Sequence, residues 1–348
     1  MTIFDLIKSQ ELTTYWETMT KDRAPYIGET LFPPRKQLSI ELKWIKGSAG
    51  LPVVLAPSAF DAKAIPIERQ GFDRLSTMMP FFKQSAYIDE EMRQQLNMVM
   101  ETGNQAYIDT IINKIFDDET RLLESARAQR ERMRMMALTT GAISIAANGQ
   151  SYVYDYGVPT SHKVQTTVPW STTTADIGND LITWQDKIEA DTGVRPTRAL
   201  CNRKTFRYFL QNDKFKKAIY VLSNGQATIT DQQMIAYIMN NYGIQLAVND
   251  KQYKTETGVT TKYVPDDTFV LFPEDDLGYT NFGTTPEESD LMANPSLANV
   301  SITDTGVAVT TIAMADPVNI ETKVSMVCLP SFELADQVAI CDVSHTGE

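Results

Sequence analysis

The stretch from Leu38 to Leu55 reads L-S-I-E-L-K-W-I-K-G-S-A-G-L-P-V-V-L and indicates an extended β-hairpin. Apolar and polar residues alternate in its first half, which is the period of a strand with one buried face. Glycines at 47 and 50 supply turn chemistry, and a second apolar run follows at 53–55. A lone two-stranded hairpin is marginal in water, so the apolar face must rest on another surface.

Composition predicts a sizeable core without a membrane segment. The chain has 348 residues, of which 43% are hydrophobic, enough for one large or two moderate domains. No run approaches the ~20 apolar residues of a membrane helix, and the first residues lack the pattern of a signal peptide, which predicts a cytoplasmic protein. A net charge of −12 repels phosphate, so the chain is expected to enclose nucleic acid more readily than to grip it.

The residues that usually carry catalysis are scarce. Cys201, Cys328 and Cys341 are widely spaced, which predicts core cysteines and neither a disulfide framework nor a thiolate metal site. His162 and His345 are the only histidines, and His162 is expected in an exposed loop. Metalloprotease, nucleophile-elbow and phosphate-loop motifs are all absent. We therefore predict no enzyme, no catalytic or metal-binding residues and no cofactor.

Charged clusters allow a few further hypotheses. Asp117 to Glu119 reads as a solvated helix face, and Glu274 to Asp276 is a weak candidate for a cation-binding turn. The basic run from Arg127 to Arg134 could contact phosphate, but interleaved glutamates favour an ordinary helix surface.

The strongest helical signal begins at Ile88, with Asp89 as the expected N-cap. Apolar residues recur every three or four positions to Met136, which predicts a helix of roughly 70 Å at ~1.5 Å per residue, with Gly103 as a candidate kink. Shorter helices and strands follow from residue 176, and long apolar strands are expected at 306–314 and 320–330. Helices and strands are partly segregated, which predicts the α+β class.

One further run carries a family resemblance. Glu256 to Leu271 reads E-T-G-V-T-T-K-Y-V-P-D-D-T-F-V-L and resembles a hairpin and strand of tailed-bacteriophage major capsid (head) proteins, the lambda-type family with the Hong Kong 97-like fold. The glycine-containing stretch at 277–283 is similar to the return strand that follows in this family. Tyr26 to Gly47 and Lys323 to Val343 resemble its extended loop and closing strands more weakly.

The resemblance implies a non-catalytic shell protein. Its regions would be an N-terminal arm at 1–36, an extended β-hairpin loop at 37–75, a peripheral domain with a long spine helix at 76–171, an axial α/β domain at 172–272, and return strands of the peripheral domain at 273–348. Copies would form the pentamers and hexamers of an icosahedral head enclosing double-stranded DNA. Scaffold, portal and decoration proteins would be partners, with assembly in the host cytoplasm and a final place in the virion.

On this interpretation the hairpin's apolar face contacts a neighbouring subunit. The residues expected at that interface are Leu38, Ile40, Leu42, Trp44, Ile45, Val53 and Leu55. Ile45 breaks the alternation, so the tip could wedge between two neighbours. Three alternatives stay open: an encapsulin-like compartment shell with the same fold, a metal-dependent hydrolase built on Asp and Glu, and a tail-tube or adaptor protein.

Overall fold

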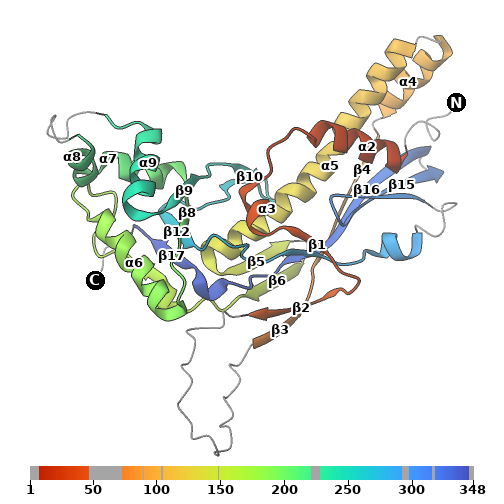
Figure 1. Cartoon of the computed structure of the whole chain (residues 1–348). Coiled ribbons are helices and arrows are strands. Elements are labelled where there is room, and N and C mark those ends of the chain that lie inside the picture. Colours follow the sequence, from red (N-terminus) through yellow and green to blue (C-terminus); the bar gives the residue numbers. More distant parts are fainter. Residues whose placement is uncertain are drawn as a thin grey trace, which may run out of the picture. The chain divides into compact units, whose positions relative to one another are not determined.

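The computed structural model describes residues 8–46, 73–88, 90–102, 105–147, 149–220, 228–291, 298–315 and 318–344 (Figure 1). The chain divides into two compact units, each assembled from segments far apart in the sequence. Unit 1 comprises Met1–Leu42, Ser76–Arg134 and Tyr279–Ser331, and unit 2 comprises Lys43–Leu75, Met135–Gly278 and Phe332–Glu348.

Unit 1 is organised by a six-stranded sheet in the order β1-β13-β16-β15-β14, with β4 also paired to β16. Its strands are β1 Pro34–Lys36, β4 Phe81–Tyr87, β13 Thr280–Phe282, β14 Asn299–Thr303, β15 Val307–Ala315 and β16 Val318–Pro330. Helices α2 Ser9–Thr20, α3 Ile27–Leu31 and α4 Glu90–Thr102, with the π-helical turn η3 Glu287–Leu291, belong to the same unit. β15 and β16 fulfil the prediction of two long strands near the end of the chain.

Two helices occupy the stretch predicted as one. α4 ends at Thr102, α5 spans Gln105–Thr140, and residues 103–104 lie outside the described part. The 36 residues of α5 give a length of about 54 Å. Its predicted apolar stripe is buried at Ile115, Leu122, Leu123, Ala126 and Met133. The expected cap at Asp89 lies outside the described residues.

Unit 2 contains a five-stranded mixed sheet in the order β7-β17-β12-β8-β9. Its strands are β7 Lys163–Gln165, β8 Arg198–Cys201, β9 Gln245–Val248, β12 Thr268–Phe272 and β17 Ala339–Asp342. Its helices are α6 Ile177–Thr192, α7 Arg203–Gln211, α8 Asp213–Ile219 and α9 Asp231–Tyr242, with short turns η1 Thr160–His162 and η4 Ala335–Gln337.

Three two-stranded pairs complete the described strands. These pairs are β2 Glu41–Lys46 with β3 Asp73–Met78, β5 Ala142–Ala147 with β6 Gln150–Asp155, and β10 Gln252–Lys254 with β11 Thr260–Lys262. The last is the hairpin predicted around Gly258, whose φ of 81° is the left-handed geometry that glycine tolerates.

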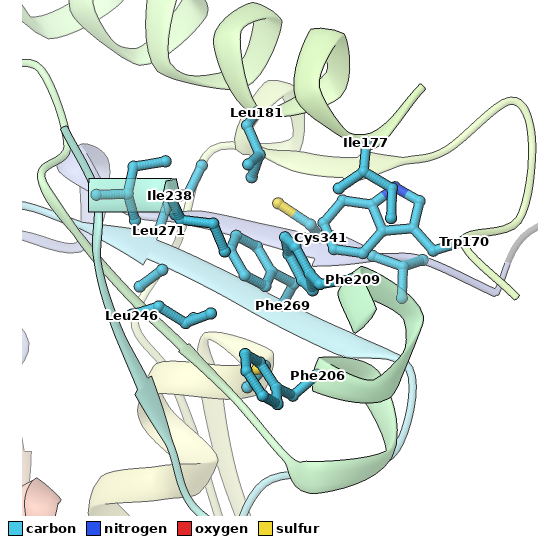
Figure 2. Packing of buried hydrophobic residues seen from close by; sticks show 14 of the residues in the cluster. Trp170, Ile177, Leu181, Phe206, Phe209, Ile238, Leu246, Phe269, Leu271 and Cys341 are labelled. Atoms are coloured by element: carbon cyan, nitrogen blue, oxygen red, sulfur yellow. The ribbon is translucent and has the colours of Figure 1, made fainter. Parts of the chain in front are cut away.

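The helices of unit 2 begin at polar residues that cap them. Asp176 caps α6, Asn202 caps α7, and Thr230 with Gln233 forms a reciprocal capping box at α9. The core centres on Trp170, whose ring stacks on Trp184 at 5.5 Å between centroids and contacts Phe209 and Phe269. Figure 2 shows this aromatic group among the aliphatic residues of α6, α9 and the sheet.

The three cysteines are buried in strands, and all three are free. Cys201 and Cys341 lie opposite Phe269 on the two neighbours of β12. Burial raises the pKa of Cys328 to about 12 and raises the pKa values of the other two thiols as well.

We therefore expect none of the three thiols to react with Ellman's reagent in the folded protein, because the reagent needs an accessible thiolate. All three should titrate at once in 6 M guanidinium, which serves as the positive control. A thiol that reacts in the folded protein at the rate of free cysteine would contradict the predicted burial.

Candidate assembly surface

The apolar stretch that begins at Leu38 starts with an exposed bend and not with a strand. β2 begins at Glu41, so the strand predicted from Leu38 is shorter than expected. Gln37 stabilises the bend, because its side-chain amide donates hydrogen bonds to the carbonyls of Ser39 and Glu41 at 3.0 and 3.2 Å. The side chains of Leu38 and Ile40 are 89% and 48% exposed and are available for contact with another molecule.

The remaining predicted interface residues divide into three groups. Leu42 is only 1% exposed because its own chain covers the side chain in this structure, and its interface role stays a prediction. Trp44 and Ile45 lie in β2, but the structure describes only their backbone. Val53 and Leu55 lie outside the described residues, so their interface role stays a prediction.

Two residues that the sequence did not single out extend this surface. Met78 at the end of β3 and Phe81 at the start of β4 are 63% and 36% exposed. The Met79 amide donates to the Ile40 carbonyl at 2.9 Å, which brings the two segments together. We call Leu38, Ile40, Met78 and Phe81 the apolar patch.

The apolar patch lies beside a close-packed glycine. A Cβ atom on Gly283 would stand 2.8 Å from the Met79 side chain and 3.1 Å from the Ser39 carbonyl. The Leu38 carbonyl also accepts a hydrogen bond of 3.3 Å from the Thr284 hydroxyl. The backbone beneath the patch is therefore fixed by its own unit, and the exposed side chains are presented on a formed surface.

The basic run in α5 is buried, which corrects the expectation of an ordinary helix surface. Arg130 is 5% exposed and its guanidinium lies 2.6 Å from the Asp304 carboxylate. Arg134 is 2% exposed, donates to the Thr280 hydroxyl at 2.8 Å and lies 3.6 Å from Glu131. Burial lowers the pKa of Arg134. These arginines fasten α5 to β13 and to the β14–β15 turn, so they are not available to bind phosphate.

The same network holds the N-terminal segment. The Glu131 carboxylate accepts a 3.0 Å hydrogen bond from the Gly28 amide in α3. Arg127 lies over the Tyr26 ring at 4.9 Å and 3.6 Å from the Glu29 carboxylate. Residues 8–36, expected as an arm, are thus attached to their own unit in this structure.

Helix α2 is attached to strand β14 by a row of polar pairs. Ser9 bonds to Asn299 at 2.6 Å, Thr13 to Ser301 at 3.0 Å, and Glu17 to Thr303 at 3.3 Å. Four residues of helix rise about 6 Å and two residues of strand about 6.6 Å, so the two spacings match over this length. β14 is not predicted from the sequence because its residues are mostly polar.

Two other charged sites also differ from expectation. His162 is 2% exposed and shares a 2.9 Å hydrogen bond with Asp191 of α6, so it does not lie in an exposed loop. Glu119 is 4% exposed and faces β16, so it is not part of a solvated helix face. The acidic turn at 274–276 is exposed, and no group of three metal-ligating residues occurs in the described part of the chain.

Solved structures share this mixed α+β arrangement. A protein described as a prophage capsid protein of Escherichia coli CFT073 is 12% identical, with a TM-score of 0.61 and coverage of 97% of this chain and 99% of that chain. A phage-related protein of Bordetella bronchiseptica RB50 is 13% identical, with a TM-score of 0.56 and coverage of 97% of both chains. At these identities the likeness establishes the fold alone, which is of the Hong Kong 97 type. No curated protein sequence matches the chain.

The family model identifies the class of protein, a phage capsid protein. The chain belongs to the family described as phage major capsid protein E, whose sequence model matches residues 8–343. Its role is therefore structural, as a component of the capsid shell of the virion. Among the described helices, none is long and apolar enough to span a membrane.

Proposed function

We propose that copies of this chain assemble into the pentamers and hexamers of an icosahedral phage head that encloses double-stranded DNA. The observation that carries the proposal is the exposed apolar patch at the start of β2 and the end of β3. Exposed apolar residues that cluster on a surface mark interaction sites. A shell of many copies needs such surfaces on every subunit, because each subunit contacts several neighbours. Each of these contacts can be weak, because many of them act together.

We assign the predicted regions to the two units as follows. α5 would act as the spine of the peripheral domain, which unit 1 largely supplies, and residues 172–272 of unit 2 would form the axial domain. Residues 37–75 would form the extended loop that reaches a neighbouring subunit. The net charge of −12 suits a wall that contains DNA without binding it tightly.

Partners in this role are other copies of the chain, a scaffold protein, a portal and, in some heads, a decoration protein. Electron microscopy of particles made during infection tests the DNA part of the proposal. Particles filled with double-stranded DNA are the expected result. A cargo enzyme inside the particles, with no DNA, would instead indicate an encapsulin-like compartment.

The loop makes a direct prediction for assembly. Replacing residues 48–71 with a short Gly-Ser turn should leave a folded subunit that no longer forms particles, because β2, β3 and the buried Leu42 are retained while the reach to a neighbour is lost. Circular dichroism would check folding, and negative-stain electron microscopy would check assembly.

A matched control shortens another hairpin by the same kind of replacement. In this control, residues 255–259, the exposed turn between β10 and β11, are replaced by Gly and Ser residues, while residues 48–71 are left unchanged. The control variant should still form particles, which would show that the loss of assembly is specific to the replacement of residues 48–71. Normal shells from the loop variant would exclude the proposed role of residues 48–71.

A further inference from the structure

A band of polar side chains crosses the sheet of unit 1 on the face that α5 covers. Asn299 of β14, Thr311 of β15 and Thr322 of β16 are opposite one another in the strand register, so their side chains point to the same face. We call these three residues the polar band. The rows of side chains on either side of it are apolar and consist of Ala313 with Ile320 and of Val309 with Val324.

Two helices contact the polar band, and only one of these contacts is a satisfied hydrogen bond. Ser9 of α2 bonds to Asn299 at 2.6 Å. Glu119 of α5 lies beside the Thr322 hydroxyl, yet neither its two oxygens nor that hydroxyl has a hydrogen-bond partner of normal geometry among the described residues. Buried polar groups are nearly always hydrogen-bonded, so the Glu119–Thr322 contact requires a physical explanation.

The packing of α5 begins at the same level. Ile115 and Phe116 are 2% and 7% exposed and are the first buried residues of the helix. Before them, the side chains that the structure describes are those of residues 108 and 110–114, and none of these is buried. Glu119 therefore belongs to the first part of α5 that packs on the sheet, and its charge affects how firmly that part is held.

We propose that the polar band is a proton-controlled hinge, at which Glu119 keeps its proton while residues 105–119 of α5 rest on the sheet and releases them when it ionises. A protonated carboxyl group is neutral and can donate its hydrogen to the Thr322 hydroxyl. Once the proton has passed to solvent, a buried carboxylate remains, and water solvates it far better than this site does. Arg130 and Arg134 keep the later part of α5 attached. This motion occurs within one subunit and does not depend on the proposed shell function.

The helices supply no cation that would hold the carboxylate in place. On α5 the adjacent Asp118 is itself acidic, and its carboxylate is paired with Arg121 at 3.1 Å. On α2 the Tyr15 hydroxyl donates to Asp117 at 2.6 Å. Burial and the charge of Asp118 raise the pKa of Glu119, which reaches about 7.

The strands supply no cation on this face either. β15 has no ionisable residue. Side chains alternate between the two faces of a sheet, so those that alternate with Thr322 and with its partner Ala86 point away from α5. The ionisable ones are Lys83 and Tyr87 of β4 and Glu321 and Lys323 of β16. On that opposite face Lys323 pairs with Glu287 at 2.8 Å.

Hydrogen exchange of unassembled subunits at pH 6 and pH 8.5, followed by mass spectrometry and corrected for the intrinsic exchange rate, tests the hinge. A carboxyl group that ionises near pH 4.5 when released and near pH 7 when buried predicts opening about tenfold more frequent at pH 8.5. Residues 105–119 should therefore exchange about tenfold faster at pH 8.5. Residues 123–140 should stay protected at both pH values, because local opening leaves them packed.

Two variants connect the effect to this contact. Glu119→Gln cannot ionise and should exchange at the same corrected rate at both pH values. Thr322→Val removes the hydroxyl that lowers the pKa of Glu119, so the increase in exchange should move to higher pH. Glu124→Gln is the matched control, because it makes the same chemical change on α5 at a side chain that is 37% exposed and paired with Arg23. It should keep the tenfold increase of the parent.

Three results would overturn the hinge. The first is an equal corrected rate for residues 105–119 of the parent at the two pH values. The second is an increase that extends equally to residues 123–140, which would indicate global unfolding. The third is an increase that persists in Glu119→Gln, which would assign the titration to another group.

Discussion

The Glu119→Gln variant is expected to be more stable than the parent protein above pH 7 and equally stable near pH 4. Glu119 lies in α5 with 4% exposure, and neither of its carboxylate oxygens accepts a hydrogen bond of normal geometry from the described residues. Its pKa is raised to about 7, mainly by burial. The nearby Thr322 hydroxyl lowers this pKa, and the negative charge of Asp118 raises it further. The buried side chains of β16 around Thr322 are Ile320 and Val324, so they supply no cation.

The sign of the effect follows from proton binding. In the unfolded chain Glu119 ionises near its ordinary pKa of 4.5, whereas in the folded chain it keeps its proton to about pH 7. Between these values the folded state binds more protons, so the free energy of unfolding falls as pH rises and then levels off. The loss should reach about 3 kcal/mol for this shift, at ~1.36 kcal/mol per pKa unit. Glutamine cannot ionise and removes this loss.

Urea denaturation of unassembled subunits between pH 4 and pH 8.5 would measure the difference. Asp118→Asn is the control, because Asp118 is the adjacent residue on α5, with its side chain 39% exposed and paired to Arg121. Asp118→Asn should keep most of the parent's pH dependence, slightly reduced because the charge of Asp118 also raises the pKa of Glu119. Identical pH profiles for Glu119→Gln and the parent would mean that Glu119 is not the group that titrates.

Replacing Arg134 with methionine is expected to destabilise the subunit by about 3 to 5 kcal/mol. The substitution keeps much of the side-chain volume but removes the charge that faces Glu131, which is 0% exposed. It also removes the hydrogen bond to Thr280. The Glu131 carboxylate would then be buried beside the Gly28 amide without its arginine partner.

The same helix provides a matched exposed pair. Arg121 and Asp118 are also three residues apart, with a separation of 3.1 Å, but the Arg121 side chain is 80% exposed. Arg121→Met should therefore cost less than about 1 kcal/mol. Adding Glu131→Gln to Arg134→Met should recover part of the lost stability, as measured by urea denaturation. Equal losses for Arg134→Met and Arg121→Met would contradict the importance of burial.

Elements with local signals were predictable from the sequence. The caps at Asp176, Asn202 and Thr230 act on backbone groups two or three residues away, so a short window contains all the necessary information. The long strands β15 and β16 were predictable because apolar residues recur along both of them.

Elements whose environment depends on distant partners were not predictable. Arg130 looked like a surface cation because its partner, Asp304, lies 174 residues further along the chain. β14 looked like a loop because its polar side chains are satisfied by α2, which no local pattern reveals. The candidate site depends on such distant contacts as well. Leu38 and Ile40 are exposed and Leu42 is buried, and Met78 and Phe81 join the patch only through the pairing at Met79.

The N-terminal part of unit 1 is completed by contacts with much later residues. The Ser9–Asn299 bond spans 290 positions and the Thr284–Leu38 bond spans 246. During synthesis the ribosome must therefore release residues beyond 284 before the surface around Leu38 can form. Neighbouring chains growing on one messenger RNA would not yet display that surface to each other, so assembly would draw on finished subunits. Contacts of such long range also slow folding, which lengthens this protected interval.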